Sequence, residues 1–219
     1  MMLLKNSRKA ILQLLELIMM TILYEVHDNI YVNMTNRCTC SCTFCVRGKQ
    51  DSVGDADSLW LEHEPTVEEV VQEFSKIDMN RYNEVVFCGF GEPTERIDDL
   101  LKVAALIKSK YNKKIRINTN GQGSLSNGRN IVPEMAGIIN SISVSLNTPN
   151  EEKYEEIVRS KFGKGAFKAM IEFTKEAKKY LKDVTMTTVS TTISKEDEIK
   201  CQQLCDKLGV HYRIRTYQE

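Results

Sequence analysis

Four of the seven cysteines fall within eight residues, at Cys38, Cys40, Cys42 and Cys45. A disulfide framework needs cysteines spread along the chain, whereas closely clustered thiols are typical of a metal site in a reducing compartment. We therefore expect these thiolates to bind a metal centre, and we expect the protein to be cytoplasmic.

Three of the four have the spacing C-x3-C-x2-C, at Cys38, Cys42 and Cys45, with the aromatic Phe44 directly before the last. This pattern resembles the radical S-adenosylmethionine (SAM) superfamily. The resemblance implies that three thiolates bind three irons of a 4Fe-4S cluster and leave the fourth iron open, whereas ordinary electron-transfer clusters use four cysteines. It also implies that SAM binds there, beside Phe44, and is reductively cleaved to a 5′-deoxyadenosyl radical that abstracts hydrogen from a substrate.

The segment CGFGEPT, which begins at Cys88, strengthens the resemblance. In the superfamily a Gly-x-Gly-Glu-Pro element contacts the methionine amino group of SAM, and Gly91 and Glu92 match it. Glycine allows the backbone to approach a ligand closely, and a glutamate accepts a hydrogen bond from an ammonium group. Taken alone, the same residues also suit a simple turn between a strand and a helix.

The segment NTNG begins at Asn118, where several similar enzymes have an acidic residue that contacts SAM. An amide keeps one acceptor but loses the charge, which argues against a salt bridge to the methionine ammonium at this position. A turn at Asn120 and Gly121 is the structural alternative.

Polar residues follow the next predicted strand in the segment SISVSLN. Ser145 and Asn147 match positions that contact the ribose or carboxylate of SAM in similar enzymes, and Arg159 falls where some relatives have a carboxylate-binding arginine. The alternatives are that Asn147 or Thr148 caps the following helix, and that Arg159 is an exposed helix residue.

The additional cysteine, Cys40, leaves a closed four-thiolate cluster or a zinc site open as alternatives. The order of the cysteines lacks the paired C-x2-C units of a zinc ribbon. A closed cluster would make the protein a non-catalytic iron-sulfur electron carrier. The motifs after the later strands, which a carrier does not need, favour the enzyme.

Four segments together resemble a group of small radical SAM proteins named for their association with TatD-type hydrolases: WLEHEPT, EVVFCGFGEPT, INTNGQG and VSLNTP. The resemblance implies an unidentified substrate, a flavodoxin or ferredoxin-type electron donor, and association with a TatD-type hydrolase. The short chain is also similar in scale to glycyl-radical-enzyme activases and 7-carboxy-7-deazaguanine synthases, which are the enzymatic alternatives.

The elements that must position these residues alternate between strand and helix. Thr66 and Glu69 form a capping box before one helix, and Ser194 and Gly209 delimit the last. This order predicts an α/β fold with a parallel sheet, either a partial (β/α)6 TIM-like barrel or an open doubly wound sheet, with its chemistry at the carboxyl ends of the strands. The expected strands are 29–34, 84–88, 114–118, 141–146, 185–189 and 210–214, and the other helices lie near 96–110 and 167–181.

With 219 residues and equal numbers of basic and acidic side chains, 30 of each, the chain suits one domain and does not suggest nucleic-acid binding. We divide it into an N-terminal extension, 1–19, and a radical SAM core, 20–219. The apolar run from Ile11 to Met20 is interrupted by Gln13 and Glu16 and is too short to cross a bilayer. It predicts an amphipathic helix or a non-native upstream segment, with membrane association as the less favoured alternative.

Near the C-terminus, Cys201 and Cys205 share one helical face with leucines and are expected in the core rather than in a second cluster. Arg213 and Arg215 alternate on the last predicted strand, so their side chains should lie on one face of the sheet. They are candidates for orienting an anionic substrate, with an exposed sheet edge as the alternative.

Overall fold

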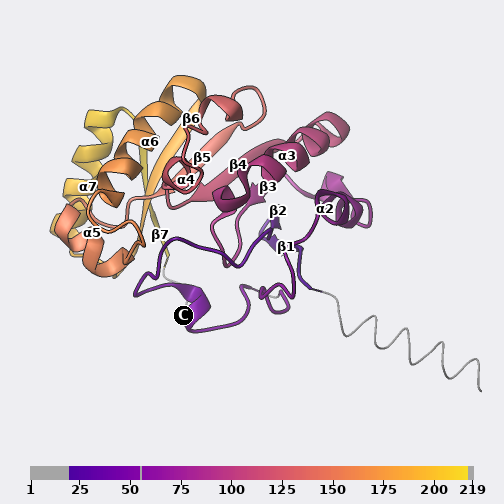
Figure 1. Ribbon diagram of the computed structural model, residues 1–219, viewed down its shortest axis with the longest axis horizontal. Helices are drawn as coiled ribbons and strands as arrows, with labels where there is room; N and C mark the ends of the chain where they lie inside the picture. The colour runs from indigo at the N-terminus through magenta and orange to yellow at the C-terminus, as the bar shows by residue number, and fades with distance from the viewer. Residues whose placement is uncertain (1–19, 55, 217–219) are drawn as a thin grey trace, which may run out of the picture.

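The computed structural model describes residues 20–54 and 56–216, and within these ranges the strands form a single sheet in the order β1 to β7 (Figure 1). Strands β2 to β7 are parallel, and β1 pairs with β2 in antiparallel orientation. Because β1 and β7 form the two edges, the sheet is not closed, and the predicted partial barrel is confirmed. The strands are β1 (Leu23–Val26), β2 (Asn29–Val32), β3 (Glu84–Phe87), β4 (Lys114–Thr119), β5 (Ser141–Ser145), β6 (Asp183–Val189) and β7 (His211–Arg215).

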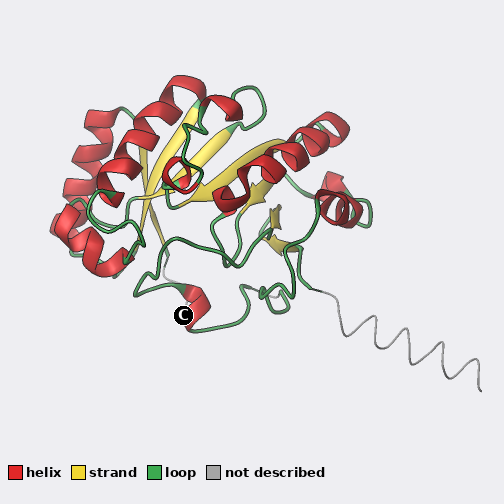
Figure 2. Cartoon of the chain, viewed as in Figure 1, coloured by secondary structure: helices red, strands yellow, loops and turns green. Residues whose placement is uncertain are grey.

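The longer helices lie on one side of the sheet, and the loop that connects β2 to α2, residues 33–66, runs along the other side (Figures 1 and 2). The helices are α2 (Val67–Phe74), α3 (Ile97–Tyr111), α4 (Gly123–Ser126), α5 (Glu151–Val158), α6 (Ala166–Tyr180) and α7 (Lys195–Leu208). Short 3-10 turns are η1 (Val46–Gly48), η2 (Met79–Arg81), η3 (Pro93–Arg96) and η4 (Pro133–Met135). None of the helices in the described part of the chain is long and apolar enough to cross a membrane.

Helix ends follow the capping residues of the sequence. Thr66 and Glu69 form the predicted capping box at α2, and Ser194 caps α7, which ends at Gly209 with φ 66°. Helix α5 is the helix expected after Asn147, although no bounds were predicted for it. Its N-cap is Asn150, whose side chain accepts a hydrogen bond from the backbone of Lys153 at 2.9 Å. The alternative in which Asn147 or Thr148 caps this helix is therefore wrong.

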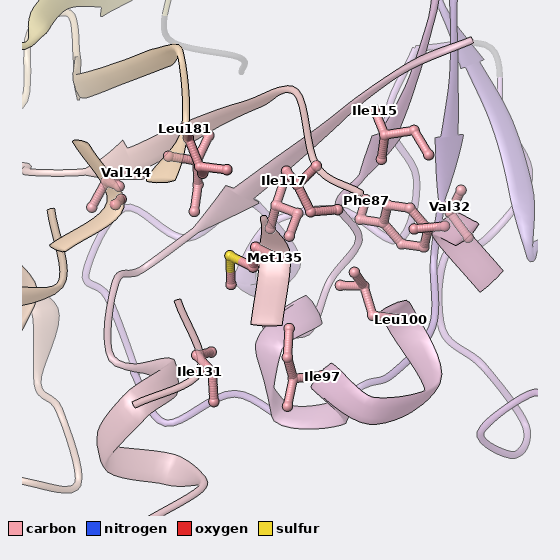
Figure 3. Packing of buried hydrophobic residues seen from close by; sticks show 14 of the residues in the cluster. Val32, Phe87, Ile97, Leu100, Ile115, Ile117, Ile131, Met135, Val144 and Leu181 are labelled. Atoms are coloured by element: carbon pink, nitrogen blue, oxygen red, sulfur yellow. The ribbon is translucent and has the colours of Figure 1, made fainter. Parts of the chain in front are cut away.

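The helix-covered face of the sheet is apolar and buried. Strand residues such as Phe87, Ile115 and Ile117 pack between the sheet and α3, where Ile97 and Leu100 meet them (Figure 3). Burial of this continuous apolar surface is the main contribution to the stability of the fold. Cys201 and Cys205 are buried in the same core, as predicted.

A smaller cluster anchors the 33–66 loop beside β1. Tyr24, Leu59 and Phe90 are buried together there, and the ring of Trp60 meets that of Phe90 edge-on at 5.1 Å. The amide of Asn33 donates to the carbonyl of Leu59 at 2.7 Å. The loop is therefore fixed against the strand edge rather than left in solvent.

Candidate functional site

The segment that carries the four cysteines leaves β2, passes Asn120 and Gln122 beyond the end of β4, and contacts the end of α5. The backbone N–H of Ser41 donates to the carbonyl of Val158 at 3.1 Å, and that of Thr43 donates to Ile157 at 2.8 Å. These bonds satisfy carbonyls that the helix end leaves without an intrahelical partner. Helix α5 thus positions the cysteine segment, a contact that the sequence did not predict.

The four thiols differ in exposure. Cys38, Cys42 and Cys45 are half-buried, whereas Cys40 is buried, and all are free thiols. Phe44 is half-buried between two of the motif cysteines in the chain, and the turn there is closed by the Cys45 N–H donating to the Cys42 carbonyl at 3.1 Å. The three cysteines of the motif are accessible as a set that does not include Cys40.

Cys40 is surrounded by polar side chains that come from other elements. Asn120 Nδ2 lies 3.4 Å and Gln122 Nε2 lies 3.3 Å from its Sγ. The same Gln122 amide group contacts the hydroxyl of Tyr154 at 3.1 Å, and Asn120 donates to Thr39 at 3.0 Å. Neither Gln122 nor Tyr154 was predicted as a site residue, although Gln122 lies inside the INTNGQG segment. These contacts hold Cys40 toward the protein.

Hydrogen bonds among the cysteine side chains connect Cys38, Cys40 and Cys42. The hydrogen bond with Cys40, together with burial, raises the pKa of the Cys38 thiol well above its usual range. For Cys40, the hydrogen bond with Cys38 lowers the pKa, but the bond with Cys42 and burial outweigh it and raise the pKa to about 12. A bound metal reverses this balance, because a coordinating thiol is deprotonated outright.

Glu92 is buried at the N-terminus of η3, where its carboxylate connects the ends of β3 and β4. Its Oε1 accepts hydrogen bonds from Thr94 N at 3.1 Å, Thr94 Oγ1 at 2.7 Å and Thr119 Oγ1 at 2.6 Å. Its Oε2 accepts one, from Asn120 N at 2.7 Å. Burial raises the pKa of Glu92, and these donors oppose the rise. Oε2 retains the capacity for one further donor.

Gly91 is required by a close approach of two backbone segments. A Cβ at this position would lie 2.2 Å from the carbonyl oxygen of Thr35 and 2.6 Å from that of Arg37. The next residue, Glu92, donates its N–H to the same Arg37 carbonyl at 2.7 Å. The glycine of the motif therefore sets the path of the chain that leads into the cysteines.

The remaining predicted SAM contacts lie in three places. Asn118 and Ser145 lie on the face of the sheet opposite the helices, and Asn118 accepts a hydrogen bond from Arg116 at 2.7 Å. Asn147 is buried just beyond β5 with φ 64°. Arg159 is exposed and ends α5, so its side chain has the location of an exposed helix residue, although its carbonyl accepts from the cysteine segment.

The described geometry joins a cysteine motif to an open parallel sheet, and residues 32–208 match the family model of the radical SAM superfamily. The chain belongs to the radical SAM superfamily. The cofactors of this superfamily are a 4Fe-4S cluster and SAM. No curated protein sequence matches the chain.

Solved radical SAM structures share the fold at low sequence identity. Streptococcus suis SuiB bound to its precursor peptide SuiA is 19% identical with a TM-score of 0.66, over 99% of this chain and 44% of that one. SuiB bound to SAM is 18% identical, with a TM-score of 0.61 over 99% and 44% of the two chains. Methylornithine synthase (PylB) is 15% identical, with a TM-score of 0.61 over 87% and 53%. The radical SAM chain described here thus spans about half the length of these proteins.

The residues at the carboxyl ends of the strands fit the cofactors of a radical SAM protein. Three half-buried thiols come from one short loop, as the three ligands of an open cubane require. Among residues 20–54 and 56–216, the buried Oδ1 of Asn147 has no hydrogen-bond partner, so this edge of the sheet holds an unused acceptor. No three His, Cys, Asp or Glu side chains of these residues are grouped to hold a metal ion. A cubane places each thiolate on a different iron, so its ligands need not converge on one point.

The face of the radical SAM sheet opposite the helices is polar. We call it the polar face, and among its residues are Glu84, Arg116, Asn118, Ser141, Ser143, Ser145, Asp183, Thr185, Arg213 and Arg215. A cavity of about 330 Å³ opens on it, lined mainly by polar side chains that include Arg116, Ser143 and Arg213. Arg213 and Arg215 share this face, as predicted.

Proposed function

We propose that this chain is a radical SAM enzyme that binds a 4Fe-4S cluster through Cys38, Cys42 and Cys45 and reductively cleaves SAM. The observation that carries the proposal is the difference in burial among the thiols, because the three motif cysteines are half-buried while Cys40 is buried against Asn120 and Gln122. When bound, the reduced cluster supplies the electron that cleaves SAM to a 5′-deoxyadenosyl radical, which abstracts hydrogen from an unidentified substrate.

The chain's own residues would bind and orient SAM around this loop. We assign the free capacity of Glu92 Oε2 to the methionine ammonium, with Gly91 providing the close approach of the backbone. The unused acceptor of Asn147 suits a ribose hydroxyl, and Ser145 lies two residues before it.

Three weaker contacts complete the proposed SAM site. Phe44 would lie against the cofactor beside the cluster, Asn118 would offer a neutral acceptor, and Arg159 would meet the SAM carboxylate by reorienting its exposed side chain. Of the three, Asn118 is already engaged, because its Oδ1 accepts from Arg116.

The same proposal extends to the domain bounds, the electron donor, the cellular location and the partner. Residues 20–219 would form the radical SAM core, and the expected extension at 1–19 lies outside the described residues. A flavodoxin or ferredoxin-type donor would supply the electron at low potential. We place the protein in the cytoplasm, because clustered free thiols need a reducing compartment. The TatD-associated subgroup, and with it a TatD-type partner, remains a proposal that depends on the sequence motifs.

The proposal is tested by 5′-deoxyadenosine formation after anaerobic reconstitution with iron and sulfide, with dithionite and SAM added. Cys42→Ala and Cys40→Ala form a matched pair, because both remove one thiol from the same loop. We expect product from the wild type and from Cys40→Ala and none from Cys42→Ala. Loss of product and of iron in Cys40→Ala would contradict the ligand set. A reducible cluster in a protein that neither binds nor cleaves SAM would contradict the enzyme and favour an electron carrier.

A further inference from the structure

We infer that the polar face binds an anionic group of the substrate, a carboxylate or a phosphate, through Arg213 and Arg215 with the help of Arg116. The inference rests on the proposed function, because it takes this face as the place where the substrate of a radical SAM enzyme lies. Four observations support it: the register of the strands, the balance of charge, an unpartnered buried guanidinium atom, and the cavity.

Strand register places the three arginines on one face. Arg116 is level with Ser141 on β5, Arg213 is level with Thr187 on β6, and Arg215 is level with Val189 on the same strand. Side chains alternate between the faces of a sheet, so residues that are level with each other point the same way. All three arginines therefore point away from the apolar core.

The charge on this face does not balance. Glu84 pairs with Arg116, with 2.9 Å between Oε2 and Nε, and both side chains are largely shielded from solvent. Among the described residues, neither Arg213 nor Arg215 forms an ion pair with a carboxylate. The other acidic residue of the face, Asp183, begins β6 and accepts a hydrogen bond from Thr185. Two positive charges therefore remain available to an anion.

The buried guanidinium group of Arg215 indicates the chemistry of the ligand. Its Nε is buried and has no hydrogen-bond partner within residues 20–54 and 56–216. Burial lowers the pKa of its guanidinium; Arg213 and Arg116 add to this effect, and Cys88 and Tyr31 oppose it. A guanidinium group presents parallel N–H donors that match the oxygens of a carboxylate or a phosphate. An oxyanion on this face would satisfy the unused donor and offset the repulsion between the arginines.

The cavity on the polar face is the proposed binding site for the anion. Its volume of about 330 Å³ is within the range of small-molecule sites, and it is lined by Arg116, Arg213 and the hydroxyl-bearing Ser141, Ser143 and Thr185, together with Asn29, Glu84, Ile142 and Asp183. Most of its lining residues lie toward the starts of the strands, whereas the cysteine segment lies beyond their ends. Arg215 is the last residue of β7 and is not itself part of the lining. Arg116 and Asn120 are separated by four residues, or about 13 Å at ~3.3 Å per residue.

This separation distinguishes a substrate anion from the carboxylate of SAM. The methionine part of SAM must reach the open iron, so its carboxylate belongs beside the cysteines, near Asn120. Arg213 is level, through Thr187, with Ser145 at the end of β5, whereas Arg116 is level with Ser141 at its start. An anion that also contacts Arg116 therefore lies deeper along the strands. The substrate would therefore be an extended molecule whose anionic end binds on the polar face and whose reacting carbon lies nearer the cluster.

The test uses the anaerobically reconstituted protein and two probes, inorganic phosphate and acetate, titrated separately by calorimetry at constant ionic strength. The variants are Arg213→Gln/Arg215→Gln, which removes both free charges, and Arg215→Lys, which keeps the charge but loses the parallel donors. Arg81→Gln is the matched control, because Arg81 is an exposed arginine on η2 that lies outside the polar face. Thermal unfolding of each variant checks that it is folded.

We expect the wild type and Arg81→Gln to bind at least one probe equally well, the double variant to bind it at least about tenfold more weakly, and Arg215→Lys to fall between them. Tighter binding of phosphate would indicate a phosphorylated substrate, and tighter binding of acetate a carboxylated one. Binding that is absent in the wild type, or unchanged in the folded double variant, would overturn the inference.

SAM affinity and 5′-deoxyadenosine formation, measured on the same samples, separate this inference from the proposed function. If the double variant loses SAM affinity in parallel with anion affinity, the arginines serve the cofactor carboxylate and the substrate assignment is wrong. A wild type that cleaves SAM but binds neither phosphate nor acetate would refute this inference alone. A wild type that binds the anion but neither binds nor cleaves SAM would refute the proposed function instead.

Discussion

The two faces of the sheet, built from the same strands, have opposite chemistry. On β4, Ile117 is buried against the helices, while the next residue, Asn118, lies on the polar face and accepts a hydrogen bond from Arg116. Because side chains alternate along a strand, one segment supplies both the core and the lining of the site. Stability and function are therefore separated here by single positions rather than by separate regions.

The two faces also differ in how well their groups are satisfied. The helix-covered face buries an apolar cluster with little exposed surface. The polar face keeps a buried Nε of Arg215 without a partner among the described residues and places arginines near one another. Such local conflicts cost stability and are expected at functional sites.

The most demanding test of this comparison is a pair of neighbouring substitutions. Ile117→Ala should lower the free energy of unfolding by about 2–5 kcal/mol, because it leaves a cavity in the core. Asn118→Ala should change it by less than about 1 kcal/mol, because surface and site residues contribute little packing. Thermal unfolding of the cluster-loaded variants measures both. Equal losses would show that the two faces do not have separate roles.

The path of the chain into the cysteine segment, beyond the ends of the strands, is tested by Gly91→Ala. The added Cβ would collide with the Thr35 and Arg37 carbonyl oxygens, so the chain leading into the cysteines must move. We expect a loss of about 1–3 kcal/mol, as for other overpacked sites, together with lower iron content after reconstitution. Gly128→Ala is the control, because a Cβ there meets nothing within 4 Å, although its φ of 62° adds some backbone strain. Normal iron content in Gly91→Ala would mean that this approach does not position the cysteines.

The charge of the polar face is tested by Glu84→Gln. Removing the carboxylate that pairs with Arg116 leaves a third guanidinium free for an anion. Phosphate or acetate affinity should then rise by roughly tenfold, about 1.4 kcal/mol. Glu134→Gln, which removes an exposed carboxylate paired with Arg129, should leave the affinity unchanged. A fall in affinity would show that Glu84 supports the site rather than competing with the anion.

The smallest effect is expected at Cys40. Cys40→Ala removes a buried sulfur and leaves the amides of Asn120 and Gln122 with one acceptor fewer. We expect a loss of about 1 kcal/mol in stability with no loss of iron. Iron analysis and thermal unfolding of the same preparation give both values, and iron content falling to that of Cys42→Ala would contradict the assignment.

Much of the fold could be predicted because the strands and helix caps have local sequence patterns. The six parallel strands and the capping residues Thr66, Ser194 and Gly209 were all recognised in this way. Strand β1 was missed because it joins β2 through a turn in which His27, rather than glycine, adopts φ 52°. The bounds of helix α5 were not predicted because it is highly charged and buries only Tyr154 and Val158.

The candidate site was predicted less completely than the fold. The cysteine spacing and the alternation of Arg213 and Arg215 are local patterns, so both could be interpreted directly. The contacts of Gln122 with Tyr154 and with Cys40 depend on tertiary packing of the segment after β4 against α5 and the cysteine segment, which no local pattern encodes. The role of Gly91 in backbone packing likewise became clear only when the Thr35 and Arg37 carbonyls were located.

The most direct test of the central claim is the electron paramagnetic resonance spectrum of the dithionite-reduced cluster, recorded with and without SAM. An open iron should bind SAM, so we predict that the spectrum of the wild type changes when SAM is added, and that Cys40→Ala gives the same change. A reduced cluster whose spectrum is indifferent to SAM in the wild type would mean that all four irons have protein ligands, and it would contradict the assignment of Cys38, Cys42 and Cys45 as an open three-cysteine site.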